Sequence, residues 1–123
     1  GEPNRLKPPG HLSDAQKEIF ENIVRMFEAS EVLGAPDTYL VAQCAIAIDR
    51  LWKLDALVNT DPAMLYDKDI ITARNAYSKD FFRCCNELSL SPQSRAKVGN
   101  MNLQHEKDKK DPLLTVLNGG APK

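Results

Sequence analysis

Proline and glycine divide this chain of 123 residues, and their positions limit what it can fold into. The eight prolines and six glycines lie mainly at the two ends and at a few joints between apolar segments. Because proline interrupts helices and the interior of sheets, regular structure has to lie between these joints. The middle of the chain is therefore expected to fold as one domain, and its length allows one modest core but not comfortably two.

The first apolar segment follows a helical period. Ser13 followed three residues later by Gln16 is a capping-box signature, which marks the start of a helix. Gly34 can take the left-handed conformation that ends a helix, and Pro36 cannot continue it. A first helix is predicted from about Asp14 to Val32, with apolar side chains at helical spacing at Ile19, Phe20, Ile23, Met26 and Phe27.

A second helix is predicted between Asp37 or Thr38, either of which can cap it, and Pro62. Its apolar stripe is broad and consists of Leu40, Val41, Cys44, Ala45, Ile48, Leu51, Trp52, Leu54 and Val58. A helix that is apolar around more than half its circumference usually packs on two sides. A central position within its own domain is the favoured explanation, and contact with another subunit is the alternative.

The sequence Asn-Thr-Asp-Pro favours a turn, so residues 59–67 are expected to connect the second helix to a third over about 68–88. This third helix has two apolar rows, one with Ile70, Tyr77 and Cys84 and the other with Phe81, Cys85 and Leu88. Packing in the core of the same chain is the simplest explanation, and packing between subunits is the alternative. Ser91 as a cap and Pro92 at the first helical position predict a short fourth helix over about 92–98.

The predicted fold class is therefore all-α, with three main helices plus a short fourth helix. Residues 1–12 are expected to be an extended N-terminal arm, because they hold Pro3, Pro8, Pro9 and Gly10. Residues 13–98 form the helical domain. Residues 99–123 are expected to be a flexible C-terminal tail that is polar at first and then carries a short apolar segment.

Charge is unevenly distributed along the chain, although the total is only −1. Residues 14–67 hold ten acids against four bases, a net charge of −6. Residues 68–98 hold six bases against three acids, a net charge of +3. Such asymmetry is typical of a positive strip that binds a polyanion, but an ordinary solvated helix face has a similar composition.

No catalytic constellation is found in the sequence. The two histidines, His11 and His105, lie in the expected arm and tail, and no set of residues has the spacing of metal ligands. No glycine-rich phosphate loop with a following lysine is present, so no nucleotide or other cofactor is expected. Cys84 or Cys85 would need a nearby base to act as a nucleophile, and the helical core offers no histidine. A binding protein without a metal, rather than an enzyme, is predicted.

No stretch approaches the roughly 20 consecutive apolar residues that span a bilayer, and the first residues lack the apolar run of a signal peptide. A cytosolic protein that is not secreted and has no membrane contact is therefore expected. The three cysteines are an odd number, and two of them are neighbours, which argues against a disulfide framework. They are predicted to be small buried side chains in a reducing compartment.

The order of these features resembles one branch of the phage terminase small subunits over about residues 7–98. The most specific element is the string Leu-Ser-Leu-Ser-Pro-Gln-Ser-Arg at residues 88–95. It is similar to a pattern of leucine, glycine, leucine, threonine or serine, proline, serine, serine and arginine. Ser89 stands where glycine is common, and Arg95 is the residue whose position matches best.

The resemblance implies a homo-oligomeric ring that binds viral double-stranded DNA at the packaging start site. It further implies regulation of the large terminase subunit, which carries the ATPase and nuclease, in the cytoplasm of the infected bacterial host. Residues 13–98 would then be the oligomerisation and DNA-recognition domain. A ring repeats the basic residues of each chain, so a few cations per chain can engage many phosphates.

The candidate DNA contacts are Arg74, Lys79, Arg83, Arg95 and Lys97, with Arg5 and Lys7 on the arm as a second set. Whether Arg95 contacts DNA or braces the fold is left open. No helix-turn-helix is recognisable, so recognition of DNA shape or bending is favoured over direct base readout.

An apolar segment in the tail, made of Leu113, Leu114, Val116 and Leu117, is the candidate contact for the large subunit. The alternative is that it folds back on its own oligomer. The main rival to the whole interpretation is a helical protein-interaction module without nucleic-acid contact, which the acidity of residues 14–67 supports. A small enzyme that uses Cys84 or Cys85 is the third hypothesis.

Overall fold

The computed structural model describes residues 6–29 and 36–101, and within these ranges the fold is all-α, as predicted. No strand occurs in either range. The predicted end of the first helix near Val32 lies outside the described residues. The helical elements are α1 (Asp14–Ala29), α2 (Thr38–Thr60), the 3₁₀ turn η1 (Pro62–Tyr66), α3 (Lys68–Glu87) and a final helix over residues 92–101.

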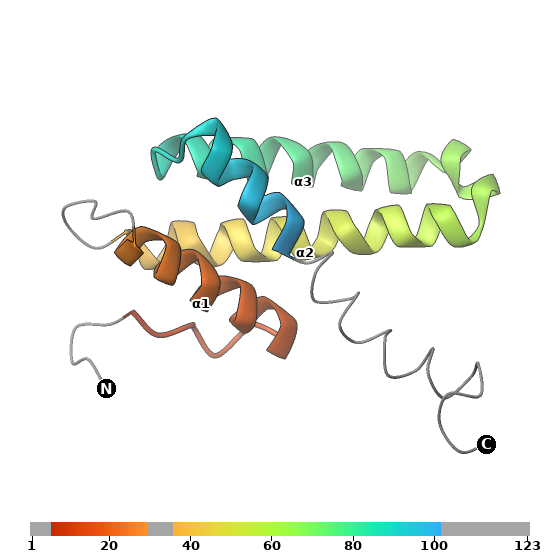
Figure 1. Ribbon diagram of the computed structural model, residues 1–123. Coiled ribbons are helices and arrows are strands. Elements are labelled where there is room, and N and C mark those ends of the chain that lie inside the picture. Colours follow the sequence, from red (N-terminus) through yellow and green to blue (C-terminus); the bar gives the residue numbers. More distant parts are fainter. Residues whose placement is uncertain (1–5, 30–35, 102–123) are drawn as a thin grey trace, which may run out of the picture.

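Helices α2 and α3 run antiparallel and form a long hairpin that η1 closes at one end (Figure 1). Asp37 caps α2, because its carboxylate accepts the amide of Leu40 at 3.1 Å. Asp67 caps α3 in the same way and accepts the amides of Asp69 and Ile70 at 2.9 and 3.1 Å. Each aspartate satisfies donors that a helix start leaves unpaired, so these local residues set where the hairpin begins and turns.

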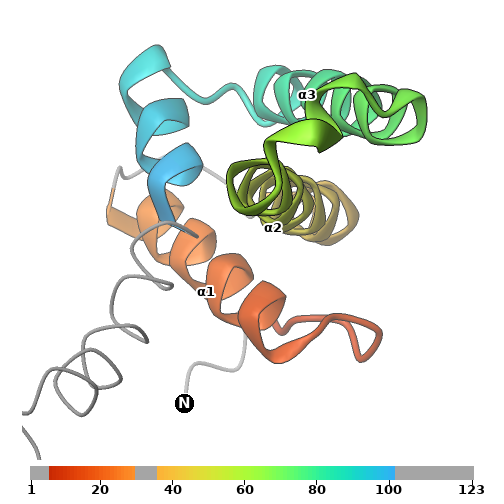
Figure 2. The same ribbon diagram turned by 90° about the vertical axis from the view of Figure 1, so that its right-hand side faces the viewer.

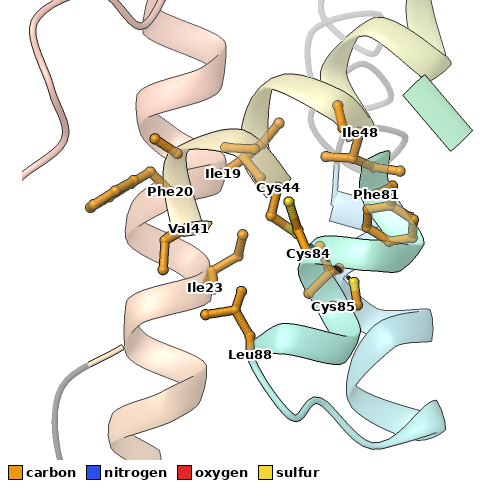
Figure 3. Close-up of a cluster of buried hydrophobic side chains, with 14 of the residues drawn as sticks. Ile19, Phe20, Ile23, Val41, Cys44, Ile48, Phe81, Cys84, Cys85 and Leu88 are labelled. Atoms are coloured by element: carbon orange, nitrogen blue, oxygen red, sulfur yellow. Dashed lines mark hydrogen bonds between the residues drawn. The ribbon is translucent and has the colours of Figure 1, made fainter. Parts of the chain in front are cut away.

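Helix α1 and the final helix lie on the same side of the hairpin (Figure 2). Helix α2 contacts α1, α3 and η1, so the predicted central position of the second helix is confirmed. The predicted core residues meet here: side chains from α1, α2 and α3 interlock in one buried cluster (Figure 3) that includes Ile19, Phe20, Ile23, Val41, Cys44, Ile48, Phe81, Cys84, Cys85 and Leu88.

The predicted capping box starts α1. The amide of Gln16 donates to the hydroxyl of Ser13 at 3.2 Å, and the amide of Ser13 donates to the side-chain oxygen of Gln16 at 3.1 Å. The amide group of the buried Gln16 side chain also donates to Asp49 of α2 at 2.8 Å, and Lys53 contacts the same carboxylate oxygen at 3.2 Å. A buried carboxylate is costly unless it is hydrogen-bonded, so these contacts fix the start of α1 against α2.

Ser89 ends α3 in a left-handed conformation, with a φ of 59°. The amide of Leu90 donates to the carbonyl of Cys85 at 3.0 Å. The amide of Ser89 donates to the carbonyl of Asn86, also at 3.0 Å. These two bonds define a Schellman motif, in which glycine is the usual left-handed residue. The place where Ser89 departs from the family-like pattern is therefore a position that favours glycine.

Replacing Ser89 by glycine is expected to stabilise the protein. The left-handed conformation costs a non-glycine residue about 1–2 kcal/mol, and glycine gives back about 0.5–1 kcal/mol through its freer unfolded chain. The expected net gain is roughly 0.5–1 kcal/mol, or a rise of a few degrees in Tm, measured by urea and thermal unfolding. Ser89→Ala, which keeps the left-handed cost, serves as the control and should give no gain.

The hairpin extends beyond the part that α1 and the final helix cover (Figure 1). We call residues 54–74, the end of α2 with η1 and the start of α3, the hairpin tip. Large apolar side chains are exposed there: Leu57 is 44%, Leu65 56%, Tyr66 84% and Ile71 45% exposed. These side chains are not buried in the core of the single chain. They are therefore available for contacts with other segments of the chain or with other copies.

Candidate nucleic-acid interface

An exposed face of α3 brings together two of the predicted basic residues. Lys79 and Arg83 lie four positions apart on the helix, so their side chains are neighbours. Phe82, which is 48% exposed, lies three residues after Lys79 and directly before Arg83. Its ring packs edge-to-face against the buried Phe81, with ring centroids 5.6 Å apart. This half of α3 therefore presents two cations beside a fixed aromatic ring.

Arg95 joins this face from the final helix. Ser91 caps that helix, because its hydroxyl accepts the amide of Ser94 at 3.0 Å, and Pro92 follows at the favoured first position. The guanidinium of Arg95 then lies over the Phe82 ring, 5.3 Å from its centroid. Such a cation–π contact holds the side chain of Arg95 in place and braces the final helix against α3. We call Lys79, Phe82, Arg83 and Arg95 the basic face.

Arg83 is paired with acids on its own helix. Its guanidinium contacts Asp80, three residues before it, and Glu87, four residues after it at 3.9 Å. The hydrogen bond to Asp80 raises the pKa of Arg83, so the cation is permanent. Exposed pairs of this kind contribute little free energy, and a phosphate can displace the carboxylate. Neither Lys79 nor Lys97 has an ion pair within the described ranges.

Arg74 lies away from the basic face. It precedes Arg83 by nine residues, which places the two side chains about 180° apart around α3. Its guanidinium binds Asp55 of α2 through two hydrogen bonds, at 2.6 and 3.1 Å. The hydrogen bond to Asp55 raises the pKa of Arg74. This bidentate contact ties the two arms of the hairpin together near its tip.

The remaining basic residues of the sequence prediction are spread more widely. Lys97 is exposed on the final helix, two residues after Arg95. Lys7 is exposed and lies with Leu6 and Pro8 beside Glu21 and Arg25 of α1. Arg5 lies outside the described residues, as do Leu113, Leu114, Val116 and Leu117 of the predicted partner segment.

Sequence reasoning missed Phe82. The apolar seam predicted for the third helix includes Phe81, which is buried, but not the neighbouring Phe82, which is 48% exposed. The available signal was its position: a phenylalanine off the seam, between two bases at helical spacing, has to face solvent or a partner.

The three cysteines form part of the core and not a reactive site. Cys44, Cys84 and Cys85 are free thiols with no exposed surface, and the sulfur atoms of Cys44 and Cys85 are 3.9 Å apart. The hydrogen bond with Cys85 and burial raise the pKa of Cys44, and burial raises the pKa of Cys84. The contact with Cys44 lowers the pKa of Cys85, but its burial withholds the sulfur from reagents.

Thiol labelling at neutral pH is therefore expected to require unfolding. With ordinary domain stability, all three cysteines should react with a disulfide reagent at least about 10³-fold more slowly than in the denatured chain. The measurement compares labelling rates with and without denaturant. A single thiol that reacts in the native protein as fast as free cysteine would revive the enzyme hypothesis.

Among the described residues, no three histidine, cysteine or acidic side chains are placed to hold a metal ion. None of the helices in the described ranges is long and apolar enough to cross a membrane.

Comparison with known proteins identifies the family. A search of curated proteins and a search of solved structures gave no match. A family model described as "Phage terminase, small subunit" matches residues 16–105, which include most of α1 and all of α2, α3 and the basic face. Since this match covers most of the sequence, the chain belongs to the phage terminase small subunit family.

Proposed function

We propose that this protein binds viral double-stranded DNA at the packaging start site as a homo-oligomeric ring, and that it regulates the large terminase subunit. Family membership supports a role in phage DNA packaging, and small terminase subunits are generally regulatory or DNA-binding proteins, not catalysts. The observation that carries the DNA-binding part is the basic face, where Arg95 lies over the exposed ring of Phe82 and Lys79 and Arg83 are exposed on the same helix as that ring.

The basic face suits a phosphate backbone better than base edges. Its cations come from two helices, α3 and the final helix, whereas base readout usually relies on one helix or ribbon that enters a groove. Arginine and lysine at the surface bind phosphates without regard to sequence, so specificity would come from DNA shape or bending. Lys97 extends the cationic surface along the final helix, and Arg5 and Lys7 are a second, separate set.

A few cations per chain bind DNA weakly, so assembly is the second part of the proposal. Each additional copy that engages the same DNA raises the total affinity without any new kind of contact. A ring of n copies would repeat the basic face n times around the DNA. Such a ring requires a head-to-tail interface between different surfaces of neighbouring chains.

The surface proposed for assembly is an outward strip of α2. Tyr39, Ile46 and Leu57 are separated by seven and eleven residues, so they lie along one face of the helix. Tyr39 is 67% and Leu57 44% exposed, and Ile46 is partly buried. The exposed Lys53 lies on the same face between Ile46 and Leu57, so one cation interrupts the strip. Exposed apolar side chains aligned on one helix face are suited to contact with another helical surface. We call Tyr39, Ile46 and Leu57 the α2 strip.

Regulation of the large subunit is the third part. The ATPase and nuclease belong to that subunit, and this chain would act on it by contact in the cytoplasm of the infected host. The proposed contact is the tail segment with Leu113, Leu114, Val116 and Leu117, because a short apolar motif on a polar tether can order when it binds another surface.

The test is fluorescence anisotropy of a labelled DNA duplex, titrated with the intact protein at several salt concentrations. The proposal expects the logarithm of the binding constant to fall linearly with the logarithm of salt concentration, with a slope of about −0.9 for each phosphate contacted. A protein that ignores DNA at low salt would instead support the rival, a helical protein-interaction module. That outcome would assign the basic face to a protein partner.

A further inference from the structure

A groove in the hairpin tip remains unexplained by DNA binding or assembly. It has a volume of about 380 Å³ and lies between α2, η1 and the start of α3. Its apolar lining consists of Val58, Met64, Leu65, Ile70 and Ile71. This volume is in the range of about 300–1,000 Å³ that holds small ligands, so the groove accepts a few side chains but not a folded partner.

The polar edge of the groove is already satisfied. Asp55 and Arg74, which line it, bind each other through the two hydrogen bonds that join α2 to α3. Asn59 also lines the groove, and its side-chain amide offers a donor and an acceptor to an extended backbone. The groove is thus mostly apolar. The charges of Asp55 and Arg74 at its edge cancel each other, and Asn59 can form hydrogen bonds with a peptide. These properties fit a short aliphatic segment.

The described chain ends next to this groove. Gly99 and Asn100, at the end of the final helix, share a second hollow with Trp52, Asp55 and Asn59 of α2. Asp55 and Asn59 line both hollows, so only the width of α2 separates the end of the final helix from the groove. The residues that follow position 101 therefore start beside the hairpin tip.

We propose that the apolar tail segment, with Leu113, Leu114, Val116 and Leu117, docks in the groove of its own chain. The eleven residues 102–112 separate it from the final helix and can span at most about 40 Å, which is more than the roughly 35 Å length of α2. The groove is therefore within reach. A short tether holds the segment near its site at an effective concentration in the millimolar range, so a weak apolar contact is enough to fill the groove.

The regulatory consequence of this inference rests on the proposed function: the segment that contacts the large subunit is covered until a partner displaces it. Contact with the large subunit would then compete with docking, and the hairpin tip would become exposed as the large subunit binds. Docking itself requires neither DNA nor the large subunit.

Hydrogen exchange of the full-length chain tests the inference, with mass-spectrometric readout of peptides that cover residues 58–71. In the double variant Leu114→Asp/Leu117→Asp, the amides of residues 58–71 should exchange at least roughly three-fold faster than in the unmodified chain. The reason is that the tethered segment no longer covers the groove. Residues 14–29 in α1 should be unchanged. Asn118→Asp adds a negative charge next to the segment without removing an apolar side chain, and it should exchange like the unmodified chain.

A groove variant gives a second, independent measurement. In the Leu65→Asp background, residues 58–71 should exchange at the same rate with the natural tail and with the double tail substitution. The reason is that Leu65→Asp removes the docking site itself. Equal exchange at residues 58–71 in the unmodified chain and the double tail variant would overturn the inference. Protection that disappears on dilution would also overturn it, since it would assign the groove to the tail of another copy. Neither result depends on DNA binding, so failure of this inference is distinct from failure of the proposed function.

Discussion

Replacing Leu57 by aspartate is expected to convert the proposed homo-oligomer into folded monomers. Leu57 is 44% exposed in the single chain, so the fold tolerates a carboxylate there. In the assembly that we propose, each interface would lose the burial of the exposed 44% of Leu57, about 1 kcal/mol, and would have to desolvate a charge, at a cost of about 3 kcal/mol. A combined loss of roughly 4 kcal/mol per interface corresponds to about three decades in the association constant.

Sedimentation velocity measures this change, and circular dichroism confirms that the monomers remain helical. Leu65→Asp is the matched control, because it makes the same substitution at a more exposed leucine of the hairpin tip that is outside the α2 strip. The control should assemble like the unmodified chain. If Leu57→Asp also assembles normally, the α2 strip is not the interface; if both variants dissociate, the interface lies at the tip itself.

Removing the two cations of the basic face that belong to α3 is expected to weaken DNA binding strongly. The variant Lys79→Ala/Arg83→Ala keeps good helix formers in α3, and both side chains are exposed, so its stability should change little. Near 0.1 M salt, each phosphate contact that is lost should cost roughly eight-fold in affinity, and the salt slope should decrease by about 0.9 per contact. Losses from several engaged copies multiply.

Arg74→Ala is the control for this variant. It removes one positive charge from the same helix, but at the side where Arg74 binds Asp55. It should cost about 0.5–1 kcal/mol of stability and leave the salt slope of DNA binding unchanged. Anisotropy titrations of all three proteins give the comparison. Equal loss of affinity in the control and the double variant would mean that net charge, and not the basic face, determines binding.

Features encoded by neighbouring residues could be predicted from the sequence. The capping box of Ser13 and Gln16, the Asp37 cap, the turn at Pro62 and the Ser91 cap each depend on residues within one helical turn, so a local pattern specifies them. The central position of α2 also follows from its own broad apolar stripe, because only contact on several sides can bury it.

Features that depend on contacts between distant residues could not be predicted. Arg74 and Asp55 are 19 positions apart, and nothing in either segment indicates that they pair. The contact of Arg95 with Phe82 depends on how the final helix crosses α3, which the Schellman turn at Ser89 sets. Net charge per segment therefore indicates which part of the chain is rich in cations, but packing decides which of these cations share a surface.

The most direct test of the proposed function is the mass of the protein–DNA complex, measured by light scattering after size-exclusion chromatography with a duplex that is longer than one binding site. The account predicts a discrete species that contains several chains on one duplex, and a protein of several chains when DNA is absent. A monomer that elutes separately from the duplex at micromolar concentration and low salt would contradict it, and would favour a helical protein-interaction module.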